Sequence, residues 1–187
     1  MTTLPMNADS PIEELIGQTL IEMLREKELA DISVKELASR AHIARSTFYA
    51  HYRNVDEVLR QIEDAIVADL VALNEPIADP SRSSASDMSF FRATMDYLDE
   101  NREVMGVLLV ERPDTRFIEA WKDGIKGHLR KRMPLQADTP EGGLAFEVAA
   151  SAMIASWTHA LKSGSEPSPD FACDIIADVL QLLERRA

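Results

Sequence analysis

"VKELASRAHIARSTFYAHYRNVDEVL", residues 34–59, decides the fold that we expect for this chain. The stretch contains two short amphipathic segments, separated by a break at "AHIA". A helix-turn-helix needs a small residue where the first helix touches the second, a tight turn about four residues later, and an apolar anchor on the second helix. Ala38, the pair His42 and Ile43, and Phe48 occupy these three places. The stretch therefore predicts a helix-turn-helix.

The second helix of this pair is expected to turn a basic and aromatic face to solvent. That face holds Arg45, Ser46, Tyr49 and, towards its end, His51 and Arg53. Arginine side chains fit guanine edges or phosphates, hydroxyl groups fit phosphates or bases, and an aromatic ring can pack against a thymine methyl group. The face is therefore a candidate DNA reader. For His51, packing at the base of the helix-turn-helix is an equal alternative.

The charge of the chain is segregated. The formal net charge is -12, yet between Ser33 and Arg53 four basic residues stand against the single acid Glu36, which leaves +3 in this window and -15 elsewhere. An acidic chain does not present a general surface for nucleic acid or anionic membrane. Any nucleic-acid site must therefore be local, and this window is the place for it.

The rest of the chain predicts helices and no strands. Ser10 and Ser33 have the spacing of helix caps, and Thr139 and Ser168 are each followed by proline and an acid, a typical helix start. The further helices are expected over residues 10–24, 54–73, 87–101, 103–111, 115–133, 139–163 and 168–186. The fold class that follows is all-α. A three-helix head over residues 10–54 would carry the helix-turn-helix, and residues 55–187 would form a larger helical body for effector binding and dimerisation.

Composition excludes several other classes of protein. The chain has 187 residues, 45% of them hydrophobic, which is ample for a core. Its single cysteine permits no internal disulfide, and the N-terminus lacks the pattern of a secretory signal, so we expect a cytoplasmic protein. We also expect no membrane partner, because no apolar stretch reaches the roughly 20 residues of a membrane span. The sequence contains no glycine-rich phosphate loop, nucleophile elbow or metal signature, so we expect no enzyme, cofactor or metal.

The same residues resemble a known family. The stretch quoted above, preceded by "IEMLREKELADIS" at residues 21–33, is similar to the N-terminal DNA-binding head of the TetR family of bacterial transcriptional regulators. The core from Thr47 to Tyr52 is the most specific part. The resemblance implies a homodimer on a palindromic operator, an effector pocket in each body, and release of DNA by a small molecule. The residues expected to bind DNA are Ser33, Lys35, Arg45, Ser46, Thr47, Tyr49, His51, Tyr52 and Arg53.

Three positions depart from the pattern of the family. His42 stands in the turn where glycine is usual, Ala44 stands where a serine usually caps the recognition helix, and Val55 stands where a lysine usually contacts phosphate. Histidine tolerates a left-handed backbone better than most residues, so the turn is expected to form. The missing serine and lysine would weaken the hold on phosphate. They suit an alternative function, that of a co-regulator or activator that binds DNA weakly or acts through a protein partner.

The body offers candidates for a pocket and for a dimer interface. Bulky apolar residues on expected helices form the pocket set, and they favour an apolar or amphipathic effector. These are Phe91, Met95, Met105, Leu108, Phe117, Trp121, Met153 and Trp157. Small residues on one helical face, with an apolar stripe on the last helix, form the interface set. These are Ala145, Ala149, Ala152, Ser156, Phe171, Ile175, Val179 and Leu182.

Overall fold

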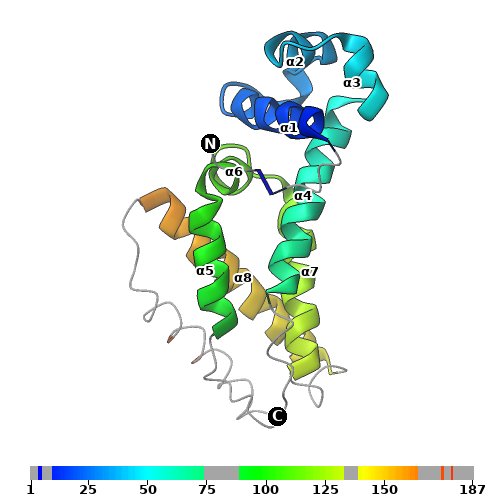
Figure 1. The fold of residues 1–187 in the computed structure, drawn as a ribbon. Helices are drawn as coiled ribbons and strands as arrows, with labels where there is room; N and C mark the ends of the chain where they lie inside the picture. Colours follow the sequence, from blue (N-terminus) through cyan, green and yellow to red (C-terminus); the bar gives the residue numbers. More distant parts are fainter. Residues whose placement is uncertain are drawn as a thin grey trace. The chain divides into compact units, whose positions relative to one another are not determined.

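The computed structural model describes residues 4–5, 10–73, 89–132, 139–163, 174 and 178, and every regular element in them is helical (Figure 1). The all-α fold class is thus confirmed. The chain divides into two compact units, of which one comprises Met1–Ala68 with Asn101–Phe117, and the other Asp69–Glu100 with Ile118–Ala187. The helix expected over residues 168–186 lies outside the described residues, as do its interface candidates Phe171, Ile175, Val179 and Leu182.

The head of the first unit begins with α1 (Pro11–Leu24), whose start follows the predicted cap. Ser10 Oγ accepts a hydrogen bond from the Glu13 N–H at 3.4 Å, and Pro11 is the first helical residue. A short 3-10 turn, η1 (Leu29–Asp31), leads to α2 (Val34–Arg40), which Ser33 caps in the same way. Helix α3 (Arg45–His51) completes the head, and Figure 1 shows α1, α2 and α3 grouped together.

The turn between α2 and α3 confirms the predicted helix-turn-helix. His42 has a φ of 56°, which is the left-handed conformation expected there, and the Ile43 N–H donates to the Ala38 carbonyl at 3.0 Å. Ala38 is 1% exposed and Phe48 is fully buried, so the small contact residue and the apolar anchor both occupy their predicted places. The buried face of α3 is therefore fixed by Phe48, and its remaining side chains face solvent.

Three further elements contribute to the first unit, besides the start of α7. The long helix α4 (Val55–Ala72) contributes Val58, Ile62 and Ile66 to the core. The helix expected over residues 103–111 is instead α6 (Arg102–Gly106) followed by a π-helical turn, η3 (Val107–Glu111). The Arg112 N–H closes this turn on the Val107 carbonyl at 2.8 Å. A π-helix has more residues per turn, so consecutive side chains diverge less, and three in succession, Val107 to Leu109, are buried.

The second unit contains α5 (Ser89–Glu100), most of α7 (Thr115–Arg132) and α8 (Pro140–Ser163). Trp121 of α7 and Trp157 of α8 stack with ring centroids 4.6 Å apart and an interplanar angle of 6°. Gly124 of α7 allows a close approach to the end of α4, because a Cβ at this position would lie 2.7 Å from Val71 Cγ2. The start of α8 follows the predicted cap, with the Gly142 N–H donating to Thr139 Oγ1 at 3.0 Å.

Helix α8 is the one helix in the described part of the chain that is long and apolar enough to cross a membrane by length and composition. Its most apolar window has a mean hydropathy of 1.2, and 44% of that window is buried inside the protein. The core helix of a soluble protein passes the same test. The buried residues of α8 include Phe146, Met153 and Trp157, each at most 1% exposed.

Candidate nucleic-acid interface

The solvent face of α3 carries most of the residues predicted to bind DNA. Arg45, Ser46 and Arg53 are exposed, and the Tyr49 side chain is 59% exposed. Thr47 is half-buried beside them. The helix holds no acid, so nothing on it repels phosphate. Ser33 and Lys35 are also exposed, at the start of α2, and Ser33 Oγ is engaged by the Glu36 N–H at 3.2 Å.

The cations of the head divide into paired and unpaired groups. Arg40 forms a bidentate pair with Glu26, at 2.7 and 2.5 Å, and Lys27 pairs with Glu36. Within the described residues the side chains of Lys35, Arg45 and Arg53 make no ion pair, and these are the three predicted to bind DNA. Their positive charge therefore remains available to phosphates or guanine edges.

Tyr52 differs from the prediction. It is 4% exposed, its hydroxyl donates to Gln61 Oε1 at 2.6 Å, and its ring packs near Phe48 with centroids 5.8 Å apart. The residue follows α3 in extended backbone, which turns the ring back into the core of the head. Tyr52 thus joins α3 to α4, and we withdraw it from the DNA-contacting set.

His51 lies beside Glu13, with Nδ1 and Oε1 2.9 Å apart. The pairing has no local sequence signal, because the two residues are 38 positions apart in the chain. The contact ties the last turn of α3 to the first turn of α1. This geometry favours the packing alternative for His51 over direct contact with DNA.

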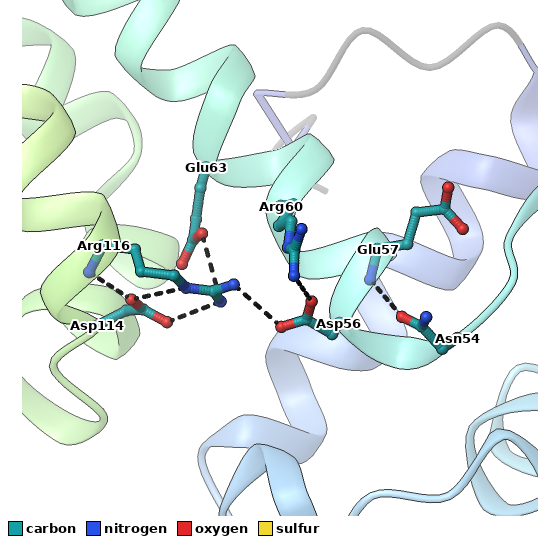
Figure 2. A network of polar contacts seen from close by, with 7 residues as sticks. All are labelled: Asn54, Asp56, Glu57, Arg60, Glu63, Asp114 and Arg116. Carbon is teal, nitrogen blue, oxygen red and sulfur yellow. Dashed lines mark hydrogen bonds and ion pairs between the residues drawn. The ribbon is translucent and has the colours of Figure 1, made fainter.

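Two of the three departures from the family pattern have a visible consequence. Ala44 occupies the N-cap of α3 and offers no side-chain hydrogen bond to it. Val55 is 7% exposed and belongs to the core, so it does not present its side chain at the surface. The cap of α4 comes instead from Asn54, whose Oδ1 accepts from the Glu57 N–H at 2.8 Å (Figure 2).

A cluster of ionisable groups joins α4 to the start of α7 within the first unit. We call it the Arg116 cluster, and it consists of Asp56, Glu63, Asp114 and Arg116 (Figure 2). The Arg116 guanidinium lies 3.1 Å from Asp56, 3.2 Å from Asp114 and 3.8 Å from Glu63, while Arg60 forms a second pair with Asp56 at 2.5 Å. Arg116 thus forms ion pairs with three carboxylates, which come from two segments of the chain.

Glu63 is the unusual member of the Arg116 cluster. It is 5% exposed, and its Oε1 is buried without a hydrogen-bond partner. Burial and the neighbouring negative charge of Asp114 raise its pKa to about 8, against the lowering influence of Arg116. At neutral pH Glu63 is therefore mostly protonated, which avoids an ion in the core of the unit.

The residues predicted to line an effector pocket are nearly all buried. Met105, Leu108 and Phe117 belong to the first unit, and Trp121, Met153 and Trp157 to the second, each at most 2% exposed. Met95 is half-buried, and the side chain of Phe91 lies outside the described part of the structure. Burial fits a core as well as a pocket lining, so their role in a pocket stays a prediction.

Two of the four small residues predicted to form a dimer interface are buried within the single chain. Ala149 is fully buried and Ala145 is 7% exposed within the single chain, because they lie on the inner face of α8 with Phe146. They are not available to a second copy in this arrangement. Ala152 and Ser156 are half-buried. The exposed apolar residues of α8 are instead Leu144, at 66%, and Val148, at 50%.

The described residues contain no group of three or more histidine, cysteine or acidic side chains that could hold a metal ion. No protein-family model matches the chain, and no curated protein matches it in sequence.

Solved structures do match the fold. A TetR-family transcriptional regulator from Streptomyces coelicolor superposes with a TM-score of 0.69 at 12% identity, over 94% of this chain and 83% of that one. The fatty acid degradation regulator FadR from Bacillus halodurans matches with a TM-score of 0.65 at 13% identity, over 95% and 96%. The dihydroxyacetone kinase operon activator DhaS matches with a TM-score of 0.55 at 19% identity, over 94% and 96%. The chain thus has the fold of these regulators.

Proposed function

We propose that this chain, which has the fold of TetR-family regulators, is itself a DNA-binding transcriptional regulator of that family, most simply a repressor. The observation that carries the proposal is the solvent face of α3. It presents Arg45, Ser46 and Tyr49 together, without an acid on the helix and without an ion pair on Arg45. A helix of this kind enters the major groove, where an arginine can recognise guanine and hydroxyl groups can position phosphates.

The proposal includes a homodimer on an imperfect palindrome. Two copies related by a two-fold axis place two recognition helices about one helical turn of DNA apart, roughly 34–36 Å, or a multiple of it. The exposed residues Leu144 and Val148 on α8 supply apolar surface for such contact. Sedimentation of the intact chain at micromolar concentration tests the dimer, and a monomer would remove the palindrome from the proposal.

The proposal also includes a small-molecule effector that changes DNA affinity. An effector can do so only if it binds the DNA-competent and released conformations unequally. The apolar pocket candidates favour an apolar or amphipathic compound, and one regulator of similar fold is named for fatty acid degradation. We propose release of the operator on binding.

The test of DNA binding is a gel shift and footprint on the intergenic DNA beside the gene for this chain. Arg45→Ala should weaken specific binding by roughly 1–3 kcal/mol and relax sequence choice at one position, and Tyr49→Phe should separate the hydroxyl from the ring. Arg130→Ala removes an exposed arginine of α7 and serves as the matched charge control. A double Arg45→Ala, Tyr49→Ala variant that leaves the footprint unchanged would exclude α3 as the reader.

A co-regulator or activator with weak DNA binding is the second candidate. It is favoured by the uncapped start of α3 at Ala44 and by the burial of Val55, since both remove phosphate contacts that the family pattern supplies. One protein of similar fold is named an operon activator. A transcription assay on the footprinted promoter separates the two, because a repressor lowers transcript when bound and an activator raises it.

A further inference from the structure

Glu63 has no part in the face that is proposed to read DNA, yet it is buried in the contact between α4 and the start of α7 (Figure 2). The residue is 5% exposed, and its Oε1 is buried without a hydrogen-bond partner in the described part of the chain. A buried carboxyl group either accepts hydrogen bonds with its oxygens or keeps a proton that removes its charge. The surroundings of Oε1 favour the second state.

The charges around Glu63 balance only when Glu63 itself is neutral. Asp56 and Arg60 belong to α4, and Asp114 and Arg116 belong to the segment that begins α7. Two carboxylates thus stand against two guanidinium groups. Ionisation of Glu63 would add a third negative charge at the least exposed of these five positions, with no cation among these groups left to compensate it.

The distances from the Arg116 guanidinium agree with a neutral Glu63. They are 3.1 Å to Asp56 and 3.2 Å to Asp114, but 3.8 Å to Glu63. The Glu63 side chain is almost fully buried, whereas that of Asp56 is 37% exposed. An ionised Glu63 would therefore be the less screened of the two and would draw the cation closer. Burial, followed by the negative charge of Asp114, raises the pKa of Glu63 to about 8 although Arg116 lowers it, which agrees with the geometry.

Loss of the proton changes which carboxylate attracts Arg116 most strongly. An ionised Glu63 outcompetes Asp56, because its charge lies in the less polar surroundings. Asp56 can release Arg116, since it keeps Arg60 as its partner one turn further along α4. Asp114 stays with Arg116 in both states, because its Oδ1 accepts the Arg116 backbone N–H at 2.8 Å. The exchange moves the guanidinium contact by about two turns of α4.

We propose that the Arg116 cluster is a proton-operated switch between α4 and the start of α7, in which Glu63 and Asp56 compete for Arg116. With Glu63 protonated, Arg116 joins the start of α7 to the first turn of α4, as the structure shows (Figure 2). With Glu63 ionised, Arg116 joins the start of α7 to the middle of α4. The proton is released to water, and no covalent bond between heavy atoms changes.

The first turn of α4 lies directly after the corner that joins it to α3. In this corner Asn54 caps α4, and the Arg53 N–H donates to Glu57 Oε2 at 2.6 Å. A contact between Arg116 and Asp56 helps to fix the direction in which α4 leaves α3. Its loss should weaken DNA binding, so the operator should be bound more tightly below about pH 8 than above it. This effect on DNA rests on the proposed function, whereas the exchange of ion-pair partners does not.

An NMR titration of the full chain tests the exchange. The side-chain carboxyl carbon of Glu63 should titrate with a midpoint near pH 8. The carbon-detected Cζ and Nε signals of Arg116 should shift with the same midpoint, because the partner of the guanidinium changes. The backbone amides of Asp56 and Glu57 should follow, since they belong to the turn that Arg116 leaves. A Glu63 signal that titrates near pH 4.5, or Arg116 signals that do not follow it, would overturn the switch.

Two variants and one control assign the titration to the switch. Glu63→Gln keeps the neutral form and should abolish the shifts of the Arg116 signals. Asp56→Asn removes the competing partner and one negative charge, and should lower the midpoint of the Glu63 titration by about one pH unit. Asp64→Asn removes an exposed carboxylate of the same helix and should leave midpoint and shifts unchanged. An unchanged midpoint in Asp56→Asn would overturn the competition between the two carboxylates.

Operator affinity is measured separately, at constant ionic strength, at about one pH unit below and above the pKa of Glu63. Couplings between linked sites commonly amount to about five- to 150-fold. Because the titration is incomplete at both ends of this range, the native chain should lose at least about threefold more affinity than Glu63→Gln. An equal loss in both chains would overturn the link to DNA. A chain in which Arg116 changes partner but which binds no operator contradicts the proposed function and supports the switch, so the two failures are distinguishable.

Discussion

Glu63 makes the stability of the first unit depend on pH in a direction opposite to that of most carboxylates. Its pKa is raised from 4.5 to about 8 in the folded chain. The folded chain keeps this proton between these two values, whereas the unfolded chain releases it near the lower one. The contribution of this proton to the free energy of unfolding is therefore complete below about pH 4.5, and it is lost as the pH rises to about 8. Glu63→Gln, which mimics the protonated form, should abolish the loss.

The size of the effect follows from the shift. At 1.36 kcal/mol per pKa unit, the rise corresponds to at most about 5 kcal/mol. The Arg116 side chain beside it is 46% exposed, so solvent and local relaxation reduce the effect to about 1–3 kcal/mol. Urea unfolding at pH 5 and at pH 9 measures it as the difference between the native chain and Glu63→Gln.

The control for this experiment is the next residue. Asp64→Asn removes an exposed carboxylate from the same helix and should keep the pH dependence of the native chain. The native chain should lose about 1–3 kcal/mol more than Glu63→Gln between the two pH values. If the native chain and Glu63→Gln lose the same free energy of unfolding between the two pH values, Glu63 is ionised at neutral pH. The assignment of a buried proton to Glu63 is then refuted.

Three further predictions concern single positions. Val55→Lys should lower the melting temperature, because Val55 is 7% exposed, and should leave unchanged the slope of log K for operator binding against log salt concentration. A slope steeper by about 0.9 per contact would show that the position faces DNA. His42→Gly should raise stability by up to about 1 kcal/mol in urea unfolding, because φ is 56° and glycine adopts this conformation without strain; a loss would mean that the His42 side chain itself stabilises the turn. Trp157→Ala should lower the free energy of unfolding by about 3–5 kcal/mol and shift the fluorescence emission of Trp121 to longer wavelength, because Trp121 loses its stacked partner. Unchanged emission would contradict the stacking of the two rings.

Local structure was predictable because its causes are local. Ser10, Ser33 and Thr139 cap helices as their spacing indicates, since a side-chain oxygen needs only the amide three residues ahead. The left-handed turn at His42 follows from the two flanking amphipathic segments, which must reverse within a few residues. The helices ended close to their predicted limits for the same reason.

The failures have a different physical origin. Glu13 of α1 lies beside His51 of α3, and Arg116 of α7 pairs with Asp56 and Glu63 of α4. Such pairs depend on how helices pack, and a single sequence does not encode that in any short spacing.

A related limit applies to Ala145 and Ala149, two of the eight residues predicted for a dimer interface. Small residues at helical spacing permit close packing, but the pattern does not specify whether the neighbour is the same chain or a second copy. Ala145 and Ala149 pack within their own chain. The π-turn at residues 107–111 was also not predictable from the sequence, because its apolar run fits an ordinary buried helix.

The ion pairs of Glu26 with Arg40 and of Glu36 with Lys27 have a consequence for non-specific DNA binding by the proposed regulator. They neutralise two cations at the edge of the head, in a molecule that is strongly acidic elsewhere. Random genomic DNA attracts proteins through phosphate charge alone, and it offers roughly 10⁶–10⁹ competing sites. A regulator with few free cations is poorly retained by those sites. If the chain is the regulator proposed above, only a small number of copies per cell would be needed to keep one operator occupied, and dissociated molecules would return to solution instead of to neighbouring DNA.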